Sequence, residues 1–491
     1  MQSRRDQVQA HMFVMGRLTS SMLRADPDAP ESPQGRTNRG VVIGVLLAVL
    51  ISAGAFVLGL LKPGTKDSWQ ASGTLVVNKD TGSRYLYLDG RLRPVRNYAS
   101  ARLLMGADMK VSMVGSASLA DTPHGAPVGI VGAPDALPGG GDLDTGPWQV
   151  CSGTASGSTG TTLAVGAQST AAGLPTTRAL LVTGPDEADY LVWRGSKLLL
   201  DDASNAREAL GYGSTPRTEV SAAFLNSLPS GPDLAPPQVA DKGAAGPSLG
   251  GRGTRIGEVF RVTVPGAAER YYLLERDGLT PLTATGAALA LGDPETRKKV
   301  YAGGAAQVAV LGADALNGRL APGSGESAQD PDLPPAPPEV VGIDAATTAC
   351  VRITAGAEGP RISVALETAA ALGPAAQAPP EGLTPACLPV ARITVKPGGG
   401  ALVRALGAGG SQVGGTLYLV TDTGMKYRVG TAKALAALGY TEGQARGLPS
   451  PLLAMLPTGP DLSPEAAVVG ESGTTAPRCG TARIDRPEGQ R

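Results

Sequence analysis

One seven-residue sequence occurs twice in this chain, and the repetition constrains the fold more than any other feature. LPSGPDL at 228–234 returns as LPTGPDL at 456–462. Tyr212 and Tyr440 are related by the same offset of 228 residues (440 − 212), as are Tyr190 and Tyr418, without a gap. Each surrounding segment is typical of strands joined by a turn, then a short Ala/Leu helix that ends at Gly. The sequence therefore predicts two copies of one folding unit.

Two further segments resemble this unit more weakly. Residues 74–106 and 270–292 share an Arg-Tyr pair, an Asp-Gly turn, a Leu-x-Pro step and an Ala/Leu run that ends at Gly. Asp-Gly between alternating apolar residues indicates a β-hairpin, because such a tight turn needs positive φ. We therefore expect four related repeats, which lie at 62–112, 179–240, 253–315 and 401–466.

Short Val/Ile strands lie beside cysteines in the segments between the repeats, 113–178 and 335–400. They predict one central β domain that both halves of the chain build together. The expected fold class is α+β, and a C-terminal tail at 467–491 follows the last repeat.

Residues 41–61, VVIGVLLAVLISAGAFVLGLL, carry no charge. A helix of about 20 apolar residues spans a bilayer core of about 30 Å, whereas core helices are usually shorter and a signal peptide has a short n-region and an A-x-A-like site. We expect one transmembrane helix. Six arginines precede it and only Lys62 and Lys66 follow closely, so residues 1–40 are expected in the cytoplasm and everything after the span outside the cell membrane.

The four cysteines, Cys151, Cys350, Cys387 and Cys479, all lie in the part expected to be exported, where disulfides form. Four cysteines allow three pairings, and their spacing does not select one. A zinc site is disfavoured, because the chain contains no C-x-x-C sequence and has only two histidines.

Before the span, apolar residues recur at helical spacing until prolines end the pattern at residue 27. This predicts an amphipathic helix in the cytoplasmic head. It either lies on the inner leaflet with its arginines at the headgroups or docks to a partner's cytoplasmic domain. The candidate partner-binding residues are Arg4, Arg5, Val8, Met12, Met15, Leu18 and Met22.

Catalytic and cofactor signatures are weak throughout. The chain has no G-x-x-x-x-G-K-[ST] phosphate loop, and its zero net charge disfavours nucleic acid as a partner. The D-T-G sequences at 80–82 and 422–424 fall in predicted hairpins, and His124 stands in a predicted turn. We therefore assign no catalytic, cofactor-binding or metal-binding residue and expect no cofactor.

Several of these segments together carry a resemblance. The head SRRDQVQAHMFVMGRL, the single span, DTGSRYLYLDGRLRPVRNYASARLLMG, VGIVGAPDALP, PWQVCSG and the twice-used LP[ST]GPDL resemble the EccB family. EccB is the single-pass core component of actinobacterial type VII (ESX) secretion systems. The resemblance runs from the N-terminus to about residue 462.

The resemblance implies an elongated, pseudo-two-fold extracytoplasmic part with four repeats around a central β domain. It implies a membrane complex with the EccC ATPase, EccD, EccE and a mycosin protease. It also implies a disulfide from Cys151 to Cys350, which leaves Cys387 and Cys479 to pair.

Two functions follow as hypotheses. The first is a non-enzymatic scaffold that organises a secretion pore outside the membrane, and the second is an extracytoplasmic ATP hydrolase of the same system. A third possibility, binding of cell-wall glycan, is disfavoured because aromatic residues make up only 4% of the chain.

The arginine bias generates the first prediction. A reporter fused after Arg491 should be active only in the exported compartment, and one fused before Met1 only in the cytoplasm, because positive charge is retained on the cytoplasmic side. Paired fusions to alkaline phosphatase and a fluorescent protein measure this. The opposite pattern would contradict the predicted orientation.

Overall fold

The structure is a computed structural model of the 491-residue chain. It describes residues 4–24, 33–61, 68–155, 158–167, 171–263, 269–323, 330–344, 346–356, 359–373, 375–376, 383–407, 411–475 and 479. Most of the expected C-terminal tail, 476–478 and 480–491, and the joints at 25–32 and 62–67 lie outside the described residues.

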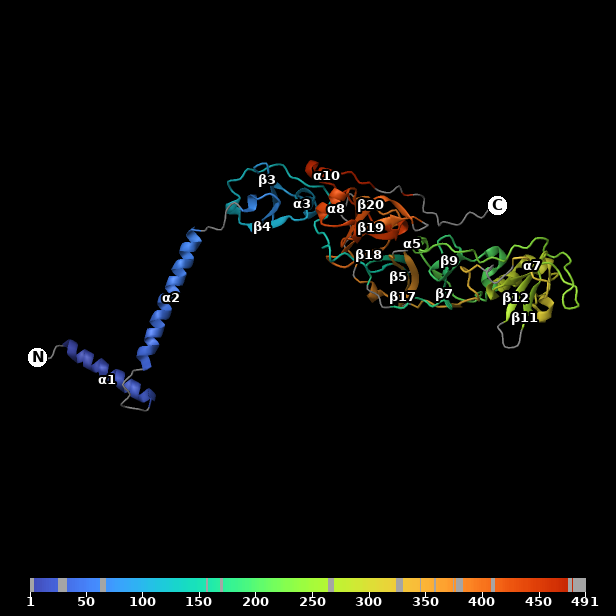
Figure 1. Cartoon of the computed structure of the whole chain (residues 1–491), viewed down its shortest axis with the longest axis horizontal. Coiled ribbons are helices and arrows are strands. Elements are labelled where there is room, and N and C mark those ends of the chain that lie inside the picture. Colours follow the sequence, from blue (N-terminus) through green and yellow to red (C-terminus); the bar gives the residue numbers. More distant parts are fainter. Residues whose placement is uncertain are drawn as a thin grey trace.

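Two helices precede the β-rich part. They are α1 (Arg4–Arg24) and α2 (Pro33–Leu61). Within α2, Thr37–Val57 is long and apolar enough to cross a membrane, with a mean hydropathy of 2.6. This window begins four residues before the apolar run of the sequence. The chain is thus α+β, with one candidate membrane helix followed by an elongated series of sheets (Figure 1).

Four sheets in the described residues share one topology, and we name them repeats 1 to 4. In each, three antiparallel strands follow in order and the fourth strand pairs in parallel with the first. The strands are β1 (Thr74–Asn78), β2 (Arg84–Leu88), β3 (Arg91–Pro94) and β4 (Lys110–Val114); β7 (Arg178–Thr183), β8 (Asp189–Trp193), β9 (Ser196–Leu199) and β10 (Thr218–Glu219); β11 (Val259–Val262), β12 (Arg270–Glu275), β13 (Gly278–Leu282) and β14 (Ala309–Leu311); and β19 (Gly400–Leu406), β20 (Gln412–Thr421), β21 (Lys426–Val429) and β22 (Arg446–Pro449). A short strand, β15 (Glu339–Val340), adds to β7.

The fifth sheet is central and draws strands from both halves of the chain. Its order is β17-β16-β5-β6-β18. The strands are β5 (Trp148–Ala155), β6 (Ser158–Val165), β16 (Thr347–Thr354), β17 (Arg361–Thr368) and β18 (Arg392–Val395). One face packs in the largest hydrophobic core against α5 (Ala222–Asn226) and α9 (Ser450–Ala454), which follow the fourth strands of repeats 2 and 4.

A helix follows the third strand of each repeat. These are α3 (Tyr98–Met105), α4 (Ala206–Ala209), α6 (Ala284–Gly292), which α7 (Pro294–Lys299) continues, and α8 (Ala432–Leu438). Side-chain caps start three of them. The side-chain oxygens of Asn97, Thr283 and Thr431 each accept a hydrogen bond from the backbone N–H of the residue three positions further along the chain. α8 ends at Gly439, whose φ of 92° is easy for glycine.

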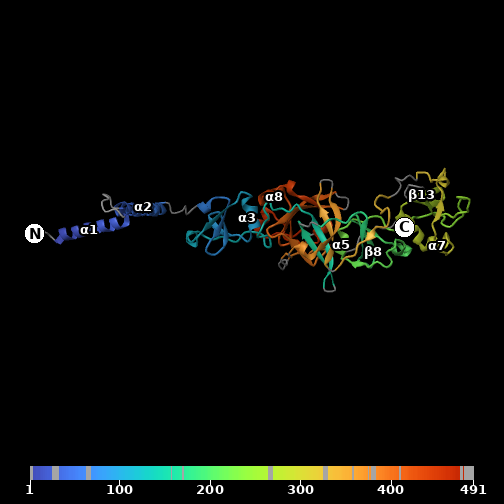
Figure 2. The ribbon, with the colours of Figure 1, turned by 90° about the horizontal axis from the view of Figure 1, so that it is seen from below.

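The repeats associate in pairs through these helices. α3 of repeat 1 packs on α8 and on α10 (Pro464–Val469), while α4 of repeat 2 packs on α6 of repeat 3. Equivalent tyrosines tie each pair to the segment entering the central sheet: Tyr440 Oη donates to Pro138 O at 2.7 Å, and Tyr212 Oη to Pro338 O at 2.8 Å. Two views show the resulting rod, with repeat 1 at one end and repeat 3 at the other (Figures 1 and 2).

The constant offset of 228 residues fails locally, contrary to the expectation of a register without gaps. Tyr190 lies opposite Leu199 in repeat 2, but Tyr418 lies opposite Arg428 in repeat 4, one residue beyond the position that the offset predicts. The turn Arg194–Gly195 has become the longer turn Asp422–Thr423–Gly424. The helix regions then restore the offset, because the first copy takes one residue more between its third strand and Tyr212.

Gly292 of α6 gives a test of the packing between repeats 2 and 3. A Cβ at this position would overlap the Cβ of Ala209 in α4. Gly292→Ala should therefore push the helices apart at a cost of about 1–3 kcal/mol and speed hydrogen exchange in α4. Gly286→Ala in the same helix is the control, since its new methyl would make only ordinary contacts and should leave exchange unchanged or slower. Equal exchange in both variants would contradict this interface.

Candidate functional site

The predicted partner-binding residues all lie on α1. The apolar side chains among them are at least half exposed, with exposed fractions of 58% for Val8, 69% for Met12, 52% for Met15, 50% for Leu18 and 83% for Met22. At about 100° per residue they occupy one stripe of roughly 120°, with Phe13, also exposed, outside it. Arg4 and Arg5 stand in the first turn and are exposed. The helix thus presents an apolar stripe that no other described element covers (Figure 1).

The central sheet holds a cross-strand disulfide at its middle. Cys151 of β5 lies directly opposite Cys350 of β16, and the structure joins them, the pairing that the family resemblance implies. Both are buried. Because they are 199 residues apart in the chain, a chain-entropy model gives the bridge about 5 kcal/mol of stabilisation. It fastens the two halves of the chain together.

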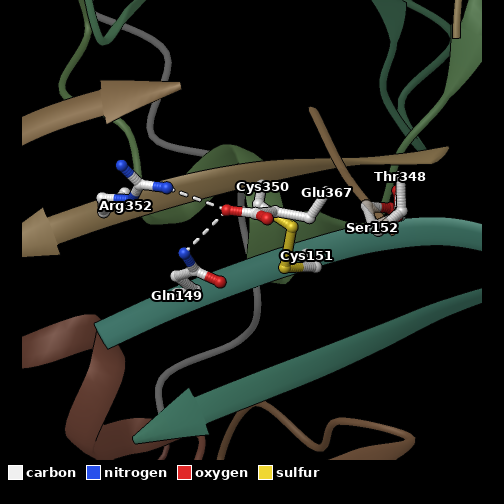
Figure 3. Close-up of a disulfide and its surroundings, with 7 residues drawn as sticks. All are labelled: Gln149, Cys151, Ser152, Thr348, Cys350, Arg352 and Glu367. Atoms are coloured by element: carbon white, nitrogen blue, oxygen red, sulfur yellow. Dashed lines mark hydrogen bonds and ion pairs between the residues drawn. A yellow bond between two sulfur atoms is a disulfide. The ribbon is translucent and has the colours of Figure 1, made fainter. Parts of the chain in front are cut away.

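A buried charged cluster flanks this disulfide (Figure 3). The Glu367 carboxylate is only 2% exposed and accepts hydrogen bonds from Arg352 Nη2 at 2.8 Å and Gln149 Nε2 at 3.0 Å. Gln149 comes from the first half of the chain, and Arg352 and Glu367 from the second. A buried carboxylate needs such partners, so the cluster favours one alignment of the halves.

The second disulfide joins Cys387 to Cys479. Before Cys479, the chain contacts repeat 4 at Asp461, a residue of the repeated LPTGPDL sequence. Asp461 pairs with Arg428 at 2.9 Å and accepts hydrogen bonds from the Thr475 amide and hydroxyl. Thr475 is thereby fastened to the fourth repeat.

Sequence reasoning missed a pair of buried lysines. Lys426 is 2% exposed, and its Nζ donates to the carbonyls of Leu453 and Leu456, each at 2.6 Å, at the end of α9. Burial lowers its pKa to about 8. Lys197 is the counterpart in repeat 2, since the two lysine amides donate to Pro229 and Pro457, which the repeat relates. The constant offset aligned Lys197 with Met425 and so concealed the match.

The described residues offer little for catalysis. They contain no group of three or more His, Cys, Asp or Glu side chains placed to hold a metal ion. The two D-T-G sequences lie in hairpin turns, where Asp80 binds the Ser116 amide at 2.7 Å and Asp422 the Gly398 amide at 2.9 Å. His124 is exposed and stacks on Tyr85, with ring centroids 5.7 Å apart. A surface pocket of about 590 Å³ between the Trp193 hairpin and the strap at 330–338 is lined mainly by prolines and threonines.

Among the described residues, one helix apolar enough to cross a membrane precedes four like sheets and a central fifth, which is the architecture of a membrane protein with a large folded domain beside its apolar helix. The chain belongs to the EccB family. The model of that family, described as "Type VII secretion system ESX-1, transport TM domain B", matches residues 1–476.

Curated and solved relatives agree with this family. The chain is 29% identical to the ESX-3 secretion system ATPase EccB3 of Mycolicibacterium smegmatis, over 96% of this chain and 91% of that protein. It resembles the chain in the structure of the EccB3 dimer from the ESX-3 core complex, with 26% identity, a TM-score of 0.62 and coverage of 80% and 99%. The periplasmic assembly from the ESX-5 inner membrane complex gives 25% identity, a TM-score of 0.62 and coverage of 82% and 96%.

Arg352 provides the test of the central cluster. Arg352→Met should leave the Glu367 charge buried without its cation, which costs about 3–5 kcal/mol and should lower the denaturant midpoint of the β-rich part. Adding Glu367→Gln should recover part of the loss, because the buried charge is then removed. Arg361→Met, an exposed position on β17, serves as the control. An Arg352→Met midpoint equal to that of Arg361→Met would show that the cluster does not stabilise the sheet.

Proposed function

We propose that the chain is a non-enzymatic structural component of a type VII secretion complex, which it organises from outside the cell membrane. The observation that carries the proposal is the rod itself: paired repeats on both sides of one sheet whose halves are cross-linked through Cys151 and Cys350. Such an arrangement offers large, fixed surfaces for contact. Two similar solved structures, an EccB3 dimer from a core complex and a periplasmic assembly, support assembly as the role.

The topology and the domain division belong to the same proposal. α1 and residues 1–40 lie in the cytoplasm, α2 spans the cell membrane once, and the repeats stand outside. The repeats occupy 62–112, 179–240, 253–315 and 401–466, and the central domain occupies 113–178 and 335–400. The partners are EccC, EccD, EccE and the mycosin protease, as the family resemblance implies.

Within this proposal, α1 is the attachment to cytoplasmic partners. Its apolar stripe is wide enough to fill a groove on another protein, and the arginines of its first turn suit an acidic rim. The same stripe would suit the inner leaflet. Detergent separates these alternatives, because it dissolves a lipid contact but leaves a protein contact in place.

A second candidate function, ATP hydrolysis outside the membrane, is favoured by one observation: the name of the curated relative contains the word ATPase. Phosphate release by the purified chain, abolished by substitution of one defined acidic residue, would support it. Release that no such substitution changes would point to a contaminant.

Removal of residues 1–24 tests the scaffold proposal. The truncated chain should keep its disulfides and its fold, yet lose co-purification with the membrane complex in detergent and stop export of small helical substrates. Met12→Glu with Met15→Glu should do the same, because charge in the stripe blocks an apolar contact. Gln7→Glu with Gln9→Glu, which adds the same charge outside the stripe, is the control.

A normal complex and normal export from the truncated chain would contradict the role of α1. His124→Ala should leave export unchanged. If it stopped export, a catalytic function would have to be reconsidered.

A further inference from the structure

Three arginines of repeat 1 form a basic patch beside β3. Arg91 and Arg93 alternate on this strand, and Arg96 follows it in the turn before α3. Residues 125–129 run alongside all three: Arg93 Nε donates to Ala126 O at 3.0 Å, and Gly129 packs against Arg96. Arg91 and Arg96 are exposed. Among the described residues none of the three forms an ion pair, so we name them the arginine patch.

The repeat structure itself shows that the fold does not need these charges. The pairing of the second and third strands places Arg91 and Arg93 at the positions of Gly278 and Thr280 in repeat 3. Arg96, which precedes the helix cap, corresponds to Leu282. The same architecture thus forms with no cation at these positions.

Repeat 2 carries a complementary acidic patch, consisting of Asp201, Asp202 and Asp233. The Asp201 amide donates to Leu234 O at 3.2 Å. This bond brings Asp201 and Asp202, which follow β9, next to Asp233. Asp202 and Asp233 are exposed. Although its side chain reaches solvent, partial burial raises the pKa of Asp233, and the neighbouring Asp201 charge raises it further. In the described part of the chain no cation pairs with any of the three.

Repeat 4 shows how the fold can neutralise this position. Its equivalent of Asp233 is Asp461, which pairs with Arg428 at 2.9 Å. Arg428 lies opposite Tyr418, whereas in repeat 2 Leu199 lies opposite Tyr190. Repeat 2 therefore keeps the aspartate and lacks the cation, so its negative charge is available to an external partner.

We propose that the arginine patch of one copy binds the acidic patch of repeat 2 on a second copy of the chain. Within one chain the two patches cannot meet, because repeats 1 and 2 lie on opposite sides of the central sheet (Figure 1). Two different surfaces in contact make a head-to-tail interface, which closes into a ring when the rotation allows it. Copies anchored in one membrane by α2 share an orientation. They can therefore be related by a rotation about the membrane normal, as the ring requires.

This inference rests on the proposed function only in requiring several copies in one membrane. It goes further by assigning which faces meet. The opposite charges would act mainly on encounter rate and on alignment.

Charge exchange tests the interface on the full-length chain in detergent by mass photometry. The first variant carries Arg91→Glu and Arg96→Glu, and the second carries Asp202→Lys and Asp233→Lys. Each variant alone should self-associate at least about tenfold more weakly than the original chain, because its two patches then carry charge of the same sign and repel. An equal mixture should recover association, since each variant again meets an opposite charge on the other.

The matched control is Arg297→Glu with Arg319→Glu, which changes the same charge at exposed positions in and just after repeat 3 and should leave association unaltered. Recovery by the mixture supports the proposal even if one variant is less stable by itself. An original chain that stays monomeric at low salt, variants that associate normally, or a mixture that stays dissociated would each overturn it. Because no partner protein is present, the outcome does not depend on whether α1 docks as proposed.

Discussion

The pairing of β5 with β16 is the contact on which the remaining architecture depends. These strands come from opposite halves of the chain and align in register from Trp148 opposite Ile353 to Ser152 opposite Ala349. The disulfide, the buried Glu367 cluster and the main hydrophobic core all lie on this sheet. Each constrains the same alignment in a different way: a covalent bond, a charge that needs partners, and apolar area removed from water.

One folding unit serves two structural roles in this chain. In repeats 2 and 4 the fourth strand leads into α5 or α9, which packs on the central sheet, and each of these repeats buries a lysine, Lys197 or Lys426. Repeats 1 and 3 lack this connection and form the two ends, where Met113 and Val310 remain 69% and 60% exposed on the fourth strands. The inner repeats therefore build the core, while the outer repeats offer surface.

The chemistry of the molecule agrees with a role in contact. Its strongest polar groups are engaged in structure: Asp80 and Asp422 in turns, Glu367 in the central sheet, and Asp461 at the end of the chain. The arginine patch and the acidic patch, which form no ion pair among the described residues, lie on repeats 1 and 2, and the apolar stripe of α1 lies apart from the rod. These surfaces are the basis of the role in assembly that we propose for this EccB-family chain.

Local patterns in the sequence determined the elements of this protein. The charge-free run required a long apolar helix, the Asp-Gly pairs placed hairpin turns, and the twice-used LP[ST]GPDL revealed a repeated unit, because each depends on neighbouring residues alone. The spacing of the cysteines left three pairings open, and the constant offset concealed the longer turn of repeat 4 and the match of Lys197 with Lys426. The sequence also did not show that α3 meets α8 while α4 meets α6. Only the tertiary structure decided these points. A Cβ at Gly292, for example, would overlap the Cβ of Ala209. Ala/Leu helix faces are chemically alike, so which helices pair depends on the fit between surfaces that lie far apart in the chain.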